Sequence, residues 1–376
     1  MPTLEQPQKC SGCFACAAAC SRHAIAVGKD AEGFAVPVVD ETLCIECGAC
    51  ETACAGRLSH LKKPRAAFAF AATSAEVLGS SASGGAFACL AAWWLEHDGV
   101  VFAVAEEDER AAFREVRSKN RLAECLGSKY YQASFDDTCI HRVCELLGKG
   151  ARVLFAGTPC QVAAVSLYVP ERNRGGLLLV DLVCQGVPSF DSVAAYREEA
   201  SRKHGSKLIE HRFRAKDPQR LGRYMTELRF ADGAIERSIG GQDSCSRAFM
   251  YNLFLRESCY RCDYAGLGRP GDITLGDFWG YSFSGCFRPG ATSLMLCNTD
   301  KGESMAAELS AWGTLVEADV DAAIAGNIPL RHPVKRPMCR GFAYGLFKAI
   351  GYSKAVGMLT WKYALKRLLR KERVGS

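Results

Sequence analysis

The sequence lacks the features of a membrane or secreted protein. Its longest apolar run, residues 86–95, has ten residues, about half of what a transmembrane helix requires. The first residues, MPTLEQPQK, lack the apolar core of a signal peptide. We therefore expect a cytoplasmic protein whose 20 cysteines act as ligands or free thiols, because a disulfide scaffold belongs to oxidising compartments.

Several catalytic signatures are also missing. The sequence has no Walker A, G-x-S-x-G or H-E-x-x-H motif, which argues against nucleotide hydrolysis, serine hydrolase and zincin chemistry. The one G-x-G-x-x-G match, residues 266–271, contains Pro270 and follows a C-x2-C pair instead of a strand. We reject it as a dinucleotide site. No side chain stands out as a general acid, so the catalytic residues stay unknown.

The composition is that of a globular protein with little charge to attract nucleic acid. The chain has 376 residues, 48% hydrophobic and 23% charged, enough for two large domains or one large domain with additions. The net charge is +6, but residues 335–376 carry eleven Lys and Arg against one acid. The basicity is a property of this tail, and we expect no nucleic-acid partner.

The amino-terminal cysteines form two copies of one spacing. Each copy reads C-x2-C-x2-C-x3-C, in which three thiolates hold one [4Fe-4S] cluster and the fourth reaches the other cluster. We expect one set to be Cys10, Cys13, Cys16 and Cys54, and the other Cys44, Cys47, Cys50 and Cys20. Structural zinc is the alternative, but its sites separate two Cys pairs by a dozen or more residues.

This amino-terminal region resembles the bacterial two-cluster ferredoxin domain. It departs from that pattern at Ser21 and Ala55, where proline usually follows the fourth cysteine. The segment between the two copies, residues 28–40, is typical of a short hairpin.

Beyond residues 61–65 the pattern changes to alternating strands and helices. Strands are expected at residues 67–72, 99–105, 152–157 and 177–183, and helices at residues 86–97, 137–147, from 161 and from 189. The first of these strands, the helix that follows it and the next strand read as a βαβ unit, and the alternation favours a mostly parallel sheet covered by helices. Farther on, Asp232-Gly233 predicts an antiparallel hairpin, and a helix is expected over residues 246–256. The fold class is α+β (mixed α/β).

Four further cysteines form a possible third ligand set. Cys160 and Cys184 each follow a predicted parallel strand, so both lie at the sheet edge where α/β proteins bind ligands. Cys259 and Cys262 form a C-x2-C pair. From spacing alone, a [4Fe-4S] cluster, a zinc site, and a redox pair beside two buried cysteines all remain open.

Six blocks of the chain carry a family resemblance. In order along the sequence they read SSASGGAF, GSKYYQ, RVLFAGTPCQ, VDLVCQGVPS, FRAKD and CYRCDYAGLGRPGDITLGDFWG. Between about residues 66 and 312 the chain resembles the coenzyme F420 hydrogenase/dehydrogenase beta-subunit family, which includes 7-hydroxymethyl chlorophyll a reductases. The resemblance implies an iron-sulfur oxidoreductase containing FAD, with Cys160, Cys184, Cys259 and Cys262 holding a cluster beside the flavin.

Candidate FAD contacts are glycine-rich and polar segments at element ends. Backbone amides at a helix start and nearby cations suit phosphate, and an aromatic or a carboxylate suits the flavin ring. Plain capping turns, polar loops and core strands are the alternatives at these positions. The candidates are Ser83, Gly84, Gly85, Ser128, Lys129, Tyr130, Thr158, Gln161, Arg214, Lys216 and Asp277.

The carboxyl-terminal tail is typical of a basic amphipathic helix. Over residues 358–373, Met358, Trp361 and three leucines share one face and the basic residues occupy the rest. Packing onto its own domain, a membrane and a partner protein are the three interpretations. The expected domains are residues 1–62 (two clusters), 66–190 (α/β), 191–335 (the carboxyl-terminal part of the beta subunit) and 336–376 (tail).

We therefore expect electrons from a redox partner protein or soluble ferredoxin to enter through the amino-terminal clusters, pass a third cluster and collect on FAD. A two-electron acceptor, coenzyme F420 or another organic molecule, would then receive them. The alternatives are a non-catalytic electron-relay subunit and a zinc-rich interaction protein. No motif identifies the substrate.

Overall fold

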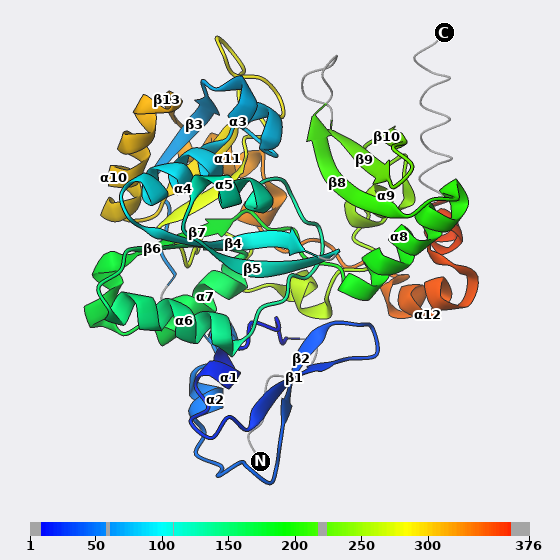
Figure 1. The fold of residues 1–376 in the computed structure, drawn as a ribbon, viewed down its shortest axis with the longest axis horizontal. Coiled ribbons are helices and arrows are strands. Elements are labelled where there is room, and N and C mark those ends of the chain that lie inside the picture. The colour runs from blue at the N-terminus through cyan, green and yellow to red at the C-terminus, as the bar shows by residue number, and fades with distance from the viewer. Residues whose placement is uncertain (1–8, 58–60, 108, 217–223, 362–376) are drawn as a thin grey trace.

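The computed structural model describes residues 9–57, 61–107, 109–216 and 224–361. It shows an eight-stranded sheet with its helices, a three-stranded sheet beside it, and a small module with two short helices and a hairpin below both (Figure 1). The α+β fold class is confirmed. Within the described residues, no helix has the length and apolarity that spanning a bilayer requires.

The small module is built around the two cysteine repeats. A hairpin joins them, with Ile25 opposite Val39 and Lys29 opposite Ala35, which confirms the hairpin predicted between the repeats. Each repeat contributes one short helix, and Phe14 and Ile25 are buried between helix and hairpin. The elements are α1 (Ala15–Ala18), β1 (Ile25–Lys29), β2 (Ala35–Val39), α2 (Ala49–Thr52) and η1 (Ala55–Arg57).

The large sheet is parallel at its centre and antiparallel toward both edges. Its order is β13-β3-β12-β11-β7-β6-β4-β5, and β4, β6, β7 and β11 run parallel. The strand β6 is buried along its whole length, as expected where helices cover both faces. The strands are β3 (Ala66–Ala72), β4 (Val100–Glu107), β5 (Arg110–Val116), β6 (Val153–Gly157), β7 (Leu177–Leu182), β11 (Ile273–Asp277), β12 (Ser293–Cys297) and β13 (Gly313–Ala318).

The predicted βαβ unit has the expected element order but not the expected neighbours. In the sheet, β3 lies between β13 and β12, and β4 lies between β6 and β5. Four strands therefore separate the two. The separating strands are β6 and β7 on the side of β4, and β11 and β12, which come from later in the chain, on the side of β3.

Helices begin at the predicted positions because the sequence supplies their caps. Asp136 accepts hydrogen bonds from the Thr138 and Cys139 amides at the start of α6, and Ser189 accepts one from Ser192 at the start of α8. These helices and their neighbours are α3 (Ala75–Ser80), α4 (Ala86–Glu96), α5 (Lys119–Leu122), η2 (Ala123–Cys125), α6 (Asp137–Gly148), α7 (Pro159–Tyr168), η3 (Glu171–Gly176) and α8 (Phe190–His204).

A second, antiparallel sheet follows α8. The turn at Asp232-Gly233 joins two of its strands and confirms the predicted hairpin. The helix expected over residues 246–256 is wrong in its length. It stops at Met250, because Asn252 adopts a left-handed conformation with φ 56°. The elements here are β8 (Leu208–Lys216), β9 (Tyr224–Phe230), β10 (Ile235–Ile239), α9 (Ser244–Met250) and η4 (Glu257–Arg261).

The last helices of the chain pack against elements that were described above. The helix α12 packs Ala343, Tyr344 and Phe347 into the core beside α8 and β8. The chain is also helical over residues 352–361, and Met358 and Trp361 are more than half exposed there. The rest of the predicted amphipathic helix lies outside the described residues. The remaining elements are α10 (Asp300–Glu308), η5 (Leu309–Ala311), α11 (Val320–Ala325), η6 (Ile328–Leu330) and α12 (Arg340–Ile350).

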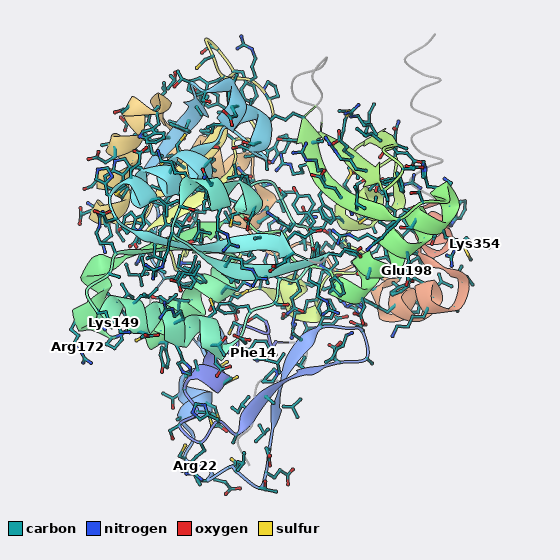
Figure 2. All side chains as sticks on the ribbon, viewed as in Figure 1. Phe14, Arg22, Lys149, Arg172, Glu198 and Lys354 are labelled. Atoms are coloured by element: carbon teal, nitrogen blue, oxygen red, sulfur yellow. The ribbon has the colours of Figure 1, made fainter. Side chains whose placement is uncertain are left out.

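The small module is packed against the main body. Ala15 and Ala18 on α1 share one hydrophobic core with Ile140 on α6 and Val162 on α7. Figure 2 shows Phe14 at this junction and Arg22 at the far end of the module. A second contact lies at the hairpin tip, where Arg340 donates to both carboxylate oxygens of Glu32 at 2.7 and 2.6 Å. The module is thus held both at its helix and at its hairpin tip.

Candidate functional site

A cavity of about 920 Å³ lies at the carboxyl ends of the central strands. Segments that follow β3, β6, β7 and β11 line it, as expected for the ligand site of an α/β sheet. Ser11 and Gly12 of the small module also line it. One cavity therefore joins residues from both halves of the sheet and from the amino-terminal repeats.

The SSASGG loop forms one wall of the cavity at the start of α4. Gly85 has φ +89°, and a Cβ at Gly84 would lie 2.2 Å from the Phe70 carbonyl oxygen and 2.5 Å from the Ser293 nitrogen. Glycine is required at Gly84 because the loop backbone touches the sheet. The loop thereby places the first residues of α4 at the cavity, where their amide groups could meet an anion.

Ser83 and Lys216 hold this loop in place. The Ser83 hydroxyl donates to the Thr292 carbonyl oxygen at 2.9 Å. The Lys216 ammonium donates to the Ser83 carbonyl oxygen at 2.7 Å and also to that of Leu78. Burial, followed by repulsion from Arg214, lowers the pKa of Lys216 to about 8. Of the loop candidates, Ser83 and Gly85 line the cavity, whereas Gly84 and Lys216 support it from behind.

The GSKYY segment forms a second wall with a cation and an aromatic ring. The Lys129 ammonium donates to the carbonyl oxygens of Leu126 at 2.8 Å and Glu124 at 3.2 Å. Burial lowers the pKa of Lys129 to about 8. The Tyr130 ring stacks on Phe249 at 4.4 Å, and burial raises the pKa of its hydroxyl. Ser128, Lys129 and Tyr130 all line the cavity.

Arg214 and Asp277 meet as an ion pair at the end of β11. Arg214 Nη1 lies 2.6 Å from Asp277 Oδ2, with 11% and 10% of the two side chains exposed. The guanidinium also lies 3.7 Å from the centre of the Tyr224 ring. Arg214 Nη2, Asp277 Oδ1 and the Tyr224 hydroxyl are buried without a hydrogen-bond partner among the described residues. Such orphaned atoms at a cavity wall point to a polar ligand, because leaving them unpaired is costly.

Thr158 and Gln161 shape the start of α7. Gln161 Oε1 accepts hydrogen bonds from the Thr158 amide at 3.0 Å and hydroxyl at 2.8 Å. The Thr158 hydroxyl lies 3.3 Å from Cys160 Sγ. Both residues line the cavity, and their bonding to each other indicates that they position Cys160 at the helix start, where the helix dipole favours a thiolate.

The four cysteines of the third set lie together. Burial, followed by the charges of Cys259, Cys160 and Cys262, raises the pKa of Cys184 well above its usual value. Close packing brings these segments together, because a Cβ at Gly186 would lie 3.3 Å from Cys259 Sγ. Cys160 and Cys184 also line the cavity.

Each amino-terminal repeat has one contact with the fourth cysteine of the other, which is consistent with the predicted crossed ligation. Burial, followed by the charges of Cys13, Cys10 and Cys54, raises the pKa of Cys16 to about 12. In the second repeat, burial raises the pKa of Cys50, and Cys20 is the cysteine whose charge adds to this rise. The fourth cysteine of each repeat thus lies near the third cysteine of the other repeat, Cys54 near Cys16 and Cys20 near Cys50.

Both cysteine environments fit iron-sulfur clusters. Buried thiols that raise one another's pKa are costly to ionise together, and bound iron would remove this cost by neutralising their charge. Among the described residues, no three His, Cys, Asp or Glu side chains are arranged to hold one metal ion. In a [4Fe-4S] cluster each thiolate binds a different iron, so the ligands stand apart.

Two residues that the sequence analysis missed connect the cysteine sets. The Tyr264 hydroxyl donates to the Ala55 carbonyl oxygen at 2.5 Å, and its neighbours include Cys13 and Cys160. Arg256 donates from Nε to the Cys10 carbonyl oxygen at 2.7 Å. Neither has a sequence signal of its own, although both flank the C-x2-C pair.

Comparison with known proteins confirms the family resemblance. Residues 150–323 match the family model for the C terminus of the coenzyme F420 hydrogenase/dehydrogenase beta chain, and residues 9–56 match a 4Fe-4S dicluster domain. A chain in the solved structure of the xenon-derivatised F420-reducing [NiFe] hydrogenase complex from Methanosarcina barkeri is also similar. It has 18% identity over 70% of this chain and 85% of that chain, with a TM-score of 0.49. No curated protein matches significantly.

Proposed function

We propose that this chain is an FAD-dependent iron-sulfur oxidoreductase that passes electrons between a redox partner protein and a two-electron acceptor, coenzyme F420 or another organic molecule. The observation that carries the proposal is that Cys160 and Cys184, which lie beside Cys259 and Cys262, line a cavity whose wall holds orphaned polar atoms. Free thiols throughout the described residues suit a reducing cytoplasm.

The cavity can bind a planar heterocycle with a phosphate-bearing tail. Arg214 Nη2 is an unpaired donor and Asp277 Oδ1 is an unpaired acceptor. The two meet in one ion pair, so they would bind a carbonyl oxygen and an N–H group of the same ring. The pyrimidine edge of a flavin presents these groups, and so does that of a deazaflavin. Lys129 and the start of α4 would face the anionic part of the ligand.

Other residues orient the ligand and exclude water. Apolar side chains such as Phe87, Leu126 and Phe249 make the cavity mostly apolar, which strengthens the polar contacts inside. The Lys216 ammonium keeps the SSASGG loop against the sheet. When bound, the clusters would supply single-electron carriers and FAD would supply the exchange between one-electron and two-electron transfer.

The test compares Cys259→Ser with Cys286→Ser, since Cys286 is exposed. We expect Cys259→Ser to lose about four iron per chain, keep the amino-terminal clusters, and fail to reduce a two-electron acceptor supplied with dithionite. Cys286→Ser should match the wild type. A wild-type chain that binds no flavin and reduces no such acceptor would instead identify an electron-relay subunit.

A further inference from the structure

Arg256 is a buried cation without a carboxylate partner. It is 3% exposed, and among the described residues its side chain contacts carbonyl oxygens, the Cys10 sulfur and the Phe34 ring, but no carboxylate. Burying an unpaired charge is costly, and arginine does not give up its proton at ordinary pH. The site must therefore supply a negative charge of another kind.

On one side, the guanidinium contacts the first cysteine repeat. Nε donates to the Cys10 carbonyl oxygen at 2.7 Å and Nη1 donates to that of Ala35 at 3.0 Å. Nη2 lies 3.9 Å from Cys10 Sγ. These carbonyl groups accept hydrogen bonds from two of the five N–H groups of the guanidinium but leave its charge unneutralised.

On the other side, the backbone of Arg256 joins two segments of the third cysteine set. Its amide donates to the Val187 carbonyl oxygen, and its carbonyl oxygen accepts from the Cys259 amide, both at 2.9 Å. The guanidinium is also close enough to Cys160 and Cys259 to favour their ionised forms. Arg256 therefore lies between the Cys10 set and the third set.

We propose that Arg256 is the shared counter-charge of two clusters, the one held by the Cys10 set and the one held by the third set. This inference rests on the proposed function, because it requires the third cluster. A [4Fe-4S] centre with four thiolates is anionic, and accepting one electron adds one negative charge. A fixed cation stabilises the reduced form and raises the reduction potential.

The arrangement predicts a specific electrochemical pattern. Removing the charge in Arg256→Gln should shift the potentials of these two clusters to more negative values. The potential of the cluster held by Cys44, Cys47, Cys50 and Cys20 should not change, which provides an internal control. Arg256→Lys keeps the charge and should keep both potentials near wild type.

Gln132→Glu provides a second test that leaves Arg256 in place. Arg256 Nη1 and Gln132 Nε2 lie 2.8 and 3.0 Å from the position of a Cβ on Gly12, so the two side chains are close. Gln132 Oε1 accepts from the Ala35 amide at 3.0 Å, which a glutamate can still do. The new carboxylate should neutralise Arg256 and lower the same two potentials.

The proposal is tested by redox titration of each variant, followed by electron paramagnetic resonance. The iron content of each variant is measured in parallel. Unchanged potentials in Gln132→Glu or Arg256→Gln at full iron content would overturn the proposal. The proposal would also be overturned if Arg256→Lys shifted the two potentials as much as Arg256→Gln does. Lysine keeps the charge, so the shift would then come from the lost contacts of the guanidinium. About eight iron in the wild type would instead overturn the proposed function.

Discussion

At the scale of single residues, the wall of the cavity contains charged side chains that are largely buried. Burial raises the free energy of their charged forms. Arg214 and Asp277 depend on each other for neutralisation, and burial lowers the pKa of Lys129 to about 8. Such groups are common at functional sites, because binding and catalysis require charges that solvent does not screen.

Asp277→Asn should destabilise the protein. It leaves the buried Arg214 without its counter-charge, which costs about 3 kcal/mol in the free energy of unfolding. Chemical denaturation measures this directly. Asp300→Asn is the control, because the Asp300 side chain is 89% exposed in its pair with Arg65. A change at Asp277 no larger than the change at Asp300 would contradict the structure.

Binding of the proposed flavin should weaken as the pH rises from 7 to 9. With a pKa of about 8, Lys129 is roughly nine-tenths charged at pH 7 and roughly one-tenth charged at pH 9. An anionic ligand therefore loses its partner over this range. Fluorescence titration with FAD measures the affinity, and Lys129→Arg, which stays charged, should flatten the dependence. If the affinity for FAD fell equally with pH in the wild type and in Lys129→Arg, Lys129 would not be the group that causes the dependence.

At the scale of elements, helix starts and strand ends converge on the cavity. The start of α4, the start of α7 and the end of β11 all reach it. Close backbone packing fixes their relative positions, most tightly where the SSASGG loop touches β3 and β12.

Gly84→Ala should displace the start of α4. The added Cβ meets backbone atoms that cannot rotate away, so we expect a loss of about 1–3 kcal/mol in stability together with weaker flavin binding. Gly79→Ala is the matched control. It lies in α3 with no atom within 4 Å of its Cβ position, and it should stabilise the helix by about 0.5–1 kcal/mol. Equal changes in stability for Gly84→Ala and Gly79→Ala would show that the backbone contact of Gly84 does not fix the start of α4.

At the scale of the whole molecule, the amino-terminal module is held at both ends. Its helix α1 shares a core with α6 and α7, and its hairpin is bound by Arg340 on α12. The proposed electron transfer between the cysteine sets requires this fixed placement, since the amino-terminal sets end at Cys54 and the third set begins at Cys160, more than 100 residues later.

Glu32→Gln should loosen the hairpin without unfolding the body. Among the carboxylates that the structure describes, it leaves the fully buried Arg340 with the more distant one of Glu257, at 3.7 Å. We expect faster hydrogen exchange in β1 and β2, while α6 and β6 keep their protection. Glu41→Gln, exposed in the same module, should leave the exchange unchanged. Identical exchange in both variants would show that Arg340 does not hold the hairpin.

Local sequence patterns predict many of the helices and strands. They do not predict which side chains from distant parts of the chain contact each other. The sequence predicts the hairpins and most helix starts, because cysteine spacing, buried strands and capping residues are patterns of a few neighbouring residues. The edge strand β5 alternates between buried and less buried positions only over its first five residues, and it was not predicted. The contacts of Arg214 with Asp277 and of Arg256 with Cys10 join residues far apart in the chain. Only the folded sheet brings them together.

The most direct test of the central claim is the content of iron, sulfide, zinc and flavin per chain in anaerobically purified protein, with absorption spectra before and after dithionite. Three [4Fe-4S] clusters and one flavin predict about twelve iron, an equal amount of sulfide and one FAD. About eight iron without flavin would contradict the account, because neither the third cysteine set nor the cavity would then hold a cofactor.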